Sequence, residues 1–410
     1  MKSMSAQQFS YPWPKCHFSD KFERVTRKNK DGNSNVLTIS AQQGLINQFE
    51  YYNHQYASED TSGYTLLKQG EFAYNKSYSE GYPWGALKRL EHYDSGIVSP
   101  LYICFAPKEG VCAGFYKQYF EAGLFNREIY KIAQEGARNH GLLNVSTEDF
   151  FKAMLADPPL PEQRKIAEIL ECCDEVIRLK KALITEKKKQ KKALMQKLLD
   201  PNSGFRLPGF EGEWRNKKLK TICKINGDTL GETTSPKFVF RYIDLSMIDH
   251  GKLIENPELI SFEIAPCRAR RCFKYGDILF STVRPYLQGF LLVDFDADEY
   301  IASTGFSILS SLYGNSNEFI YHQLFSYGVN LQIKNLLTGT NYPALNGQDV
   351  GNLIFAIPPT QKEQQAIADI LSAADQEIDL LEQELEQQEK KKKSLMQLLL
   401  TGIVGCRYGY

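Results

Sequence analysis

Two long segments of this chain nearly repeat each other, and this repeat is the strongest constraint on its fold. The first segment covers residues 158–199 and the second covers residues 358–400. Both open on a proline pair, and from Glu162 and Glu363 onward equivalent positions keep a constant separation. A repeat held in register over so many positions indicates a duplicated structural unit.

Each segment has the sequence pattern of one long helix. Proline is well suited to the first helical turn, where its missing N–H costs no hydrogen bond. Apolar residues then recur at alternating spacings of four and three, which is typical of a coiled-coil seam. The predicted seam residues are Ile166, Leu170, Cys173, Ile177, Ile184, Ile367, Leu371, Ala374, Ile378, Leu381 and Leu385.

The charges along the two predicted helices indicate their relative direction. The first is acidic over residues 162–175 and basic over residues 180–192, and the second is acidic over residues 375–384 and basic over residues 390–393. An antiparallel pair places each basic half beside an acidic half, whereas a parallel pair places like charges together. We therefore predict an antiparallel coiled coil. The alternative is that these charges are solvated and have no orienting role.

Composition narrows the class of protein. A chain of 410 residues, 42% hydrophobic, is expected to form two or three domains with real cores. No apolar run is long enough to span a membrane and residues 1–14 lack a signal-peptide core, so we expect a cytoplasmic protein without membrane contact. The nine cysteines are scattered without metal-ligand spacing, which favours reduced thiols and no metal site.

The repeat extends beyond the helices, at lower similarity. Trp13 and Trp214 keep the separation of the helices, and residues 67–76 and 97–103 resemble residues 273–282 and 301–308. Short β-like runs and helical patches at residues 120–137 and 317–337 complete each half. The predicted parts are a domain at 1–157, a long helix at 158–200, a linker at 201–213, a second domain at 214–357, a second long helix at 358–402 and a tail at 403–410.

The predicted fold class is α/β (α+β). Two similar globular domains are separated by an antiparallel coiled coil and related by a pseudo-twofold in an inverted arrangement. Helices of about 38 residues span roughly 57 Å. A twofold suits duplex DNA, whose half-sites about one turn (~34–36 Å) apart could be bound by one domain each. Because the two domains differ in sequence, the predicted target is bipartite and asymmetric. The net charge of zero means that local patches or partners must supply the positive field.

The chain resembles the specificity subunits of type I restriction–modification systems. The residues that carry the resemblance are the helix starts at 158–170 and 358–371, the Leu-Met-Gln helix ends, the openings around Trp13 and Trp214, and the segment 207–214. The resemblance implies two target recognition domains docked on two methyltransferase subunits, with restriction (translocase) subunits added for cleavage. It also implies that this chain is not an enzyme and binds no cofactor, since S-adenosylmethionine belongs to the methyltransferase partner.

The predicted contacts to double-stranded DNA are polar residues in the divergent domains. Arginine suits guanine, while asparagine and glutamine suit adenine. Each residue has an alternative interpretation as a solvated surface group, and each arginine also suits phosphate. The candidates are Lys68, Asn75, Lys76, Lys88, Arg89, Arg138, Asn139 and His140 in the first domain and Arg268, Arg270, Arg271, Thr282, Arg284, Gln288, Lys334, Asn341 and Tyr342 in the second.

Two rival functions remain open: a coiled-coil scaffold without DNA specificity, and a self-sufficient DNA methyltransferase. The segment 157–160, Asp-Pro-Pro-Leu, resembles the Asp-Pro-Pro-aromatic motif of amino-methyltransferases. However, Leu160 replaces the aromatic residue and the second copy has Ile357 in place of the acid, so a helix start is the favoured interpretation. No glycine-rich cofactor loop follows a predicted strand, and no G-x-x-x-x-G-K-[ST] loop occurs.

Overall fold

The computed structural model describes residues 13–405 except residues 41, 55, 80, 134–142, 250 and 338–342. The chain divides into two compact units. Unit 1 comprises residues 1–181 and 384–410, and unit 2 comprises residues 182–383. Each unit therefore contains a globular part and portions of both long helices.

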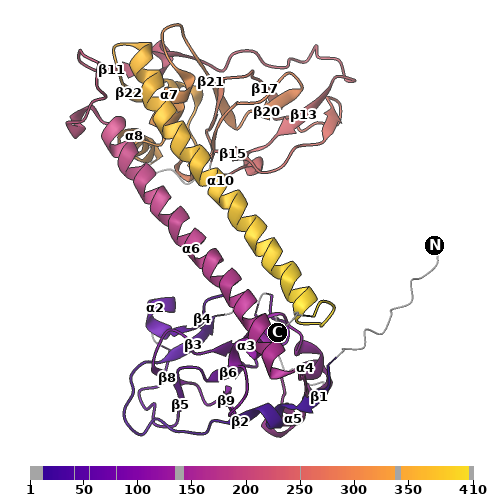
Figure 1. The fold of residues 1–410 in the computed structure, drawn as a ribbon. Coiled ribbons are helices and arrows are strands. Elements are labelled where there is room, and N and C mark those ends of the chain that lie inside the picture. Colours follow the sequence, from indigo (N-terminus) through magenta and orange to yellow (C-terminus); the bar gives the residue numbers. More distant parts are fainter. Residues whose placement is uncertain are drawn as a thin grey trace. The chain divides into compact units, whose positions relative to one another are not determined.

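The long helices are α6 (Leu160–Leu198) and α10 (Gln361–Leu399), which pack together (Figure 1). In unit 1 the early part of α6 pairs with the late part of α10, and in unit 2 the late part of α6 pairs with the early part of α10. The helices therefore run antiparallel in both units, which confirms the prediction from the charges. The ion pairs are Lys180–Glu384, Lys181–Glu389 and Lys392–Asp174 in unit 1 and Lys187–Glu377, Lys188–Glu382 and Lys191–Asp375 in unit 2.

The globular part of unit 1 is built in three layers around a four-stranded sheet of order β2-β9-β6-β7. Alternate residues of a strand face opposite sides. Phe72 and Tyr74 accordingly join the core under the helices, while Ala73 joins the core under the remaining strands. The elements are β1 (Lys15–His17), α1 (Phe18–Lys21), β2 (Phe22–Arg24), β3 (Leu37–Ser40), β4 (Gly44–Asn47), α2 (Gln48–Tyr52), β5 (Thr65–Lys68), β6 (Phe72–Asn75), β7 (Ala86–Arg89), β8 (Ser95–Val98), β9 (Ile103–Pro107), α3 (Ala113–Glu121), α4 (Asn126–Ile132), α5 (Thr147–Lys152) and β10 (Met154–Ala156).

The globular part of unit 2 has the same plan, with a four-stranded sheet of order β12-β21-β18-β19 and a second of order β16-β13-β20-β17. Ile278 and Phe280 face the helices, and Leu279 between them faces the second sheet. The elements are η1 (Pro201–Ser203), β11 (Arg215–Lys218), η2 (Leu219–Thr221), β12 (Cys223–Ile225), β13 (Val239–Ile243), η3 (Leu245–Met247), β14 (Ile248–Asp249), β15 (Lys252–Leu253), β16 (Leu259–Ser261), β17 (Ala269–Cys272), β18 (Ile278–Ser281), η4 (Pro285–Leu287), β19 (Phe290–Leu292), β20 (Tyr300–Ser303), β21 (Phe306–Ser311), α7 (Asn317–Leu324), α8 (Tyr327–Leu337), α9 (Gly347–Asn352) and β22 (Ile354–Ile357).

The two globular parts share one topology. In each, the first strand pairs antiparallel with the strand that precedes the long helix: β1 with β10 and β11 with β22. The parallel pairing of β13 with β20 has its counterpart in the parallel bridge between Val36 and Ile97. The weak sequence repeat therefore corresponds to a duplicated fold.

The end of each long helix completes the core of the unit built around the start of the other helix. In unit 1, Leu399 and Leu400 of the second segment are buried in the same cluster as Ile166 and Leu170. In unit 2, Leu198 and Leu199 are likewise buried with Ile367 and Leu371. This burial explains why both helices end on the same apolar residues. The other predicted seam residues, Cys173, Ile177, Ile184, Ala374, Ile378, Leu381 and Leu385, are all buried or half-buried.

The repeated Trp and Glu residues form one contact in each unit. Trp13 Nε1 donates to Glu162 at 3.2 Å, and Trp214 Nε1 donates to Glu363 at 3.3 Å. The side chain of Gln163 donates to Asp157 and to the Pro158 carbonyl, which fastens the helix start to the preceding strand. The Asp-Pro-Pro-Leu segment is thus occupied in starting α6.

Within the described part of the chain, no helix is long and apolar enough to cross a membrane. Every described cysteine is a free thiol. Among the same residues, no group of three or more His, Cys, Asp or Glu side chains is arranged to hold a metal ion.

Candidate nucleic-acid interface

Four segments of unit 2 meet along one edge, which we call edge 2: residues 268–271, 282–288, 303–305 and 343–345. Backbone hydrogen bonds join them in sequence. Thr304 N donates to Arg268 O at 2.8 Å, Thr282 N donates to Gly305 O at 2.9 Å, Leu345 N donates to Thr282 O at 2.9 Å and Arg284 N donates to Pro343 O at 2.8 Å. Edge 2 therefore brings together the predicted residues Arg268, Arg270, Arg271, Thr282, Arg284 and Gln288.

The first three arginines of edge 2 are held differently. Arg268 is exposed and lies 3.6 Å from Asp244. The Arg270 guanidinium stacks over the Phe262 ring at 4.6 Å. Arg271 is half-buried, its Nε has no hydrogen-bond partner among the described residues, and burial lowers its pKa. Of these three arginines, Arg268 is the one that is exposed.

Of the remaining predicted residues of edge 2, two are bonded within the protein and one is exposed to solvent. Thr282 is buried, and its Oγ1 donates to Gly305 O at 2.7 Å. Gln288 Nε2 donates to Asn330 Oδ1 at 2.9 Å. Arg284 is exposed. Lys334 is exposed on α8, outside the four segments.

Unit 1 has a corresponding edge, edge 1, formed by residues 75–79, 81–85, 99–102 and 143–145. Tyr74 lies opposite Ile103 in the antiparallel pair of β6 and β9, so the residues after β6 and before β9 share one end of the sheet. Leu143 N donates to Lys76 O at 3.0 Å, as Leu345 N does to Thr282 O in unit 2. Edge 1 contains the predicted residues Asn75 and Lys76, both half-buried.

Of the other described candidates of unit 1, Arg89 and Lys68 lie away from edge 1, and Lys88 bonds Tyr82 of edge 1. Arg89 is opposite Phe72, at the far end of β6, and bonds Glu91 at 2.7 Å. Lys88 is buried and donates to Glu121 at 2.6 Å and to the Tyr82 hydroxyl at 3.1 Å. A DNA contact by Lys88 would have to break these bonds, so its position favours a packing role. Lys68 is exposed at the end of β5.

The sequence interpretation missed a group of exposed aromatic side chains on and after α2. Phe49, Tyr51, Tyr52 and Tyr56 are all exposed. The Tyr52 ring meets those of Tyr51 and Tyr56 edge to face, with centroids 4.6 and 5.2 Å apart. Burial raises the pKa of Tyr102, a residue of edge 1, and Tyr52 adds to the rise. The density of aromatics in residues 49–56 was visible in the sequence, but their exposure was not.

Five predicted residues lie outside the described part of the chain: Arg138, Asn139, His140, Asn341 and Tyr342.

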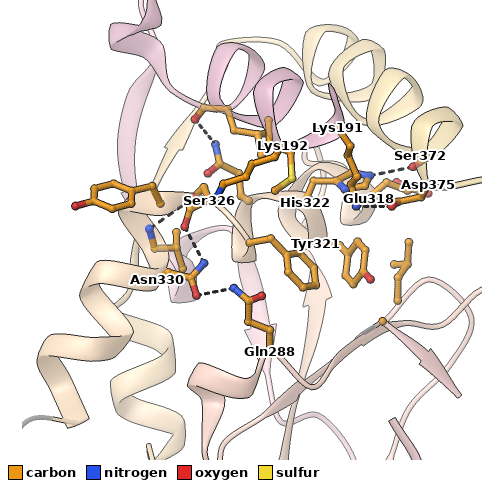
Figure 2. A pocket seen from close by; sticks show the side chains of 18 of the residues that line it. Lys191, Lys192, Gln288, Glu318, Tyr321, His322, Ser326, Asn330, Ser372 and Asp375 are labelled. Carbon is orange, nitrogen blue, oxygen red and sulfur yellow. Dashed lines mark hydrogen bonds and ion pairs between the residues drawn. The ribbon is translucent and has the colours of Figure 1, made fainter. Parts of the chain in front are cut away.

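A cavity of about 1940 Å³ lies in unit 2 between the globular part and the paired helices (Figure 2). The polar side chains around it bond one another. Lys191 pairs with Asp375, and the Nε2 of His322 lies 3.0 Å from the Ser372 hydroxyl. Burial, with a contribution from Lys191, lowers the pKa of His322 to about 3. The cavity therefore lies where the helices meet their globular part, and the His322–Ser372 contact joins the two across it.

The chain is similar in sequence to a known protein family. Residues 211–390 match the family described as type I restriction modification DNA specificity domain. The chain is 25% identical over 320 residues to the type I restriction enzyme MjaVIII specificity subunit of Methanocaldococcus jannaschii, covering 75% of this chain and 74% of that protein. It is 31% identical over 190 residues to the HindI specificity subunit of Haemophilus influenzae, covering 43% of this chain and 39% of that protein.

Solved structures agree in fold. The type I restriction–modification S subunit from M. genitalium superimposes with a TM-score of 0.59 at 15% identity, covering 97% of this chain and 98% of that chain. A chain from a structure of type I R-M complex assembly gives a TM-score of 0.51 at 14% identity, covering 96% of this chain and 99% of that chain. The matched sequences and the duplicated fold lead to one conclusion: residues 211–390 match a type I restriction modification DNA specificity domain, and the chain is similar in sequence and fold to type I restriction–modification specificity subunits.

Proposed function

We propose that this chain is the non-catalytic DNA-recognition subunit of a type I restriction–modification complex and that each globular part binds one half of a bipartite, asymmetric target. One observation carries the proposal. Edges 1 and 2 occupy equivalent positions of a duplicated fold and are closed by equivalent hydrogen bonds, yet they carry different side chains. A shared scaffold with divergent edges is what recognition of two different half-sites requires.

Recognition in this proposal is a matter of selective binding. Positively charged side chains on phosphates set the register of the protein on the duplex, while contacts to base edges discriminate sequence. Edge 2 offers exposed arginines for both tasks, and edge 1 offers Lys76 with neighbouring aromatic rings. Because the chain has no net charge, partner subunits supply part of the positive field that holds DNA.

The long helices support docking of two methyltransferase subunits. Leu179 and Leu380 are equivalent residues of α6 and α10, in unit 1 and unit 2 respectively, and they are 52% and 61% exposed. A large apolar side chain at the same outward position of both helices suits two copies of one partner. These partners bind S-adenosylmethionine and perform the methylation, and restriction subunits join the complex for cleavage.

Mapping of methylated bases tests the proposal. DNA is isolated from cells that express this chain with its methyltransferase partner and from cells that express the methyltransferase alone. We expect methylation within two short sequence blocks separated by base pairs of no preference, and only when this chain is present. One continuous palindromic block would contradict recognition by two different edges. Methylation without sequence preference would instead support a scaffold role.

A separate measurement tests the alternative of a self-sufficient methyltransferase. Isothermal titration of the isolated chain with S-adenosylmethionine should give no saturable heat. Tight binding at one molecule per chain would overturn the assignment of the chemistry to the partner.

A further inference from the structure

The loop that joins β18 to β19 has an unusual backbone. Among the described residues, only four other than glycine have a positive φ angle: Asn53, Asn226, Arg284 and Gln288. Asparagine tolerates this left-handed conformation, whereas arginine and glutamine rarely adopt it. Two of the four therefore represent real strain, and they flank the same short turn, η4 (φ 48° at Arg284 and 56° at Gln288).

Contacts on both sides hold this strained loop in place. Arg284 N donates to Pro343 O at 2.8 Å, and Gln288 Nε2 donates to Asn330 Oδ1 at 2.9 Å. Pro285, between them, is buried. Strain of this kind persists only where the surroundings fix it, and it gathers at functional sites because it positions a side chain in advance. The loop is therefore rigid at its base and directs particular side chains outward.

The side chain that gains most from this positioning is Arg284. It is exposed, and within the described part of the chain its guanidinium makes no hydrogen bond or ion pair, in contrast to Arg268 beside Asp244 and Arg270 on Phe262. Tyr286, two residues on, is 51% exposed. Leu287 and Gln288 line the cavity beside the helices, and Arg284 and Tyr286 are not among its lining residues.

We propose that Arg284 contacts a base in the half-site bound by unit 2 and recognises guanine through its O6 and N7 atoms in the major groove. The inference rests on the proposed function, namely that edge 2 binds DNA. A guanidinium presents a fixed fork of donors that matches these two acceptors. A flexible arginine is sufficient for a phosphate contact, whereas a base contact benefits from a backbone fixed before binding, since less conformational entropy is lost. Arg268, exposed and beside Asp244, is assigned to phosphate.

The equivalent position of edge 1 carries a different residue. Because Lys76 and Thr282 accept equivalent backbone hydrogen bonds, Arg284 corresponds in register to Tyr78, which is also exposed. A tyrosine cannot form the two parallel N–H donations of arginine. The guanine preference is therefore a property of one half-site only.

The test uses the whole complex of this chain with its methyltransferase partner, assayed for methylation of a duplex library and for DNA binding at several salt concentrations. Arg284→Ala should lower discrimination at one G·C pair of one half-site by about ten- to a hundredfold and leave the other half-site unchanged. Arg284→Lys should keep most of the affinity because it keeps the charge, whereas Arg284→Gln should move the preference at that pair from guanine toward adenine, which suits an amide side chain. Arg268→Ala should weaken binding to all DNA sequences alike. It should also reduce the slope of the logarithm of the binding constant against the logarithm of salt concentration by about one.

The outcomes separate three cases. An Arg284→Ala complex with an unchanged target preference, or a uniform loss of binding that Arg284→Lys restores, makes Arg284 a phosphate contact at most and overturns the inference. If the alanine variant fails to fold, Arg284→Gln decides the question, because a base contact predicts a changed preference at one base pair and a phosphate contact predicts a uniform loss of binding. A wild-type complex without sequence preference refutes the proposed function itself, and is recognised before any variant is made.

Discussion

The two units show how one fold is kept while its surface changes. Both units have the same strand order, the same Trp–Glu contact and the same hydrogen bond that closes the edge. The exposed residue at the equivalent loop position is Tyr78 in edge 1 and Arg284 in edge 2. Positions that fasten the globular part to the helices are thus repeated, and positions that face outward are free to differ.

The comparison also exposes differences at the junction between the globular parts and the helices. In unit 2, Arg206 bonds Glu363 through two nitrogen atoms at 3.0 and 2.8 Å, and Glu363 is 1% exposed. In unit 1, Glu162 accepts the Trp13 bond and has no ion pair among the described residues. The same repeated glutamate is therefore a charged partner in one unit and lacks a described cation in the other. Such differences allow one unit to be perturbed with the other as an internal reference.

The largest expected effect comes from Arg206. Arg206→Ala leaves the buried Glu363 carboxylate without its cation, and breaking a buried pair in this way costs about 3–5 kcal/mol of unfolding free energy. Hydrogen exchange read by mass spectrometry should show faster opening of the unit 2 core, with unit 1 unchanged. The double variant Arg206→Ala/Glu363→Gln should recover part of the loss, because the uncompensated charge is removed. Equal destabilisation of both units would contradict the local role of this pair.

The helix ends provide the next test. Leu400→Ala removes a buried side chain from the unit 1 core, and Leu199→Ala does the same in unit 2, each at a cost of about 2–5 kcal/mol. Although Leu400 belongs to the second half of the sequence, we expect its truncation to open unit 1, and truncation of Leu199 to open unit 2. Hydrogen exchange of each core is again the measurement. If each substitution opens the other unit instead, the assignment of each helix end to the core around the start of the other helix is wrong.

The sequence predicted the long helices and their direction because both depend on local patterns. Periodicity fixed the helices to within a few residues, and blocks of charge indicated the antiparallel pairing. The patch predicted as helical at residues 120–137 was less accurate. It overlaps two helices separated at Gly123, whose positive φ ends the first of them. Breaks of this kind depend on a single backbone angle, which apolar periodicity does not report.

The candidate site was harder to predict, because it depends on burial. Lys88 and Arg284 look alike in sequence, yet Lys88 is buried against Glu121 and Arg284 is exposed. The left-handed backbone at Arg284 also runs against local expectation, since the residue before a proline favours an extended conformation. Tertiary contacts determine both the burial of Lys88 and the backbone conformation of Arg284. The sequence alone contains no direct signal for either.

The next prediction uses pH to separate the two units. His322 of α7 is buried beside Lys191, and its pKa falls from its usual value near 6.5 to about 3. At the equivalent place in unit 1, buried Gln118 bonds Asp174 and has no proton to gain. Protonation of His322 therefore favours the unfolded chain. The free energy of unfolding therefore does not depend on His322 above pH 6.5. It falls as the pH drops below 6.5, and the loss is about 2 kcal/mol at pH 5.

We accordingly expect mild acid to weaken unit 2 before unit 1 in hydrogen exchange between pH 7 and pH 5. His322→Gln, which copies the residue of unit 1, should remove most of that difference. A pH response that survives the substitution would assign the effect to other groups, such as the carboxylates that pair with lysines along the helices.

The smallest expected effect concerns the charges that orient the helices. Lys188→Glu in unit 2 places like charges opposite Glu382, and Lys181→Glu in unit 1 does the same opposite Glu389. Each pair is exposed, so each change should cost less than about 1 kcal/mol. The reciprocal change Glu382→Lys should restore the stability of the Lys188→Glu variant in a double-mutant cycle, and the recovery should shrink in high salt. If the double variant is no more stable than the sum of the single changes predicts, the charges are merely solvated, and the apolar contacts of the helices alone set their direction.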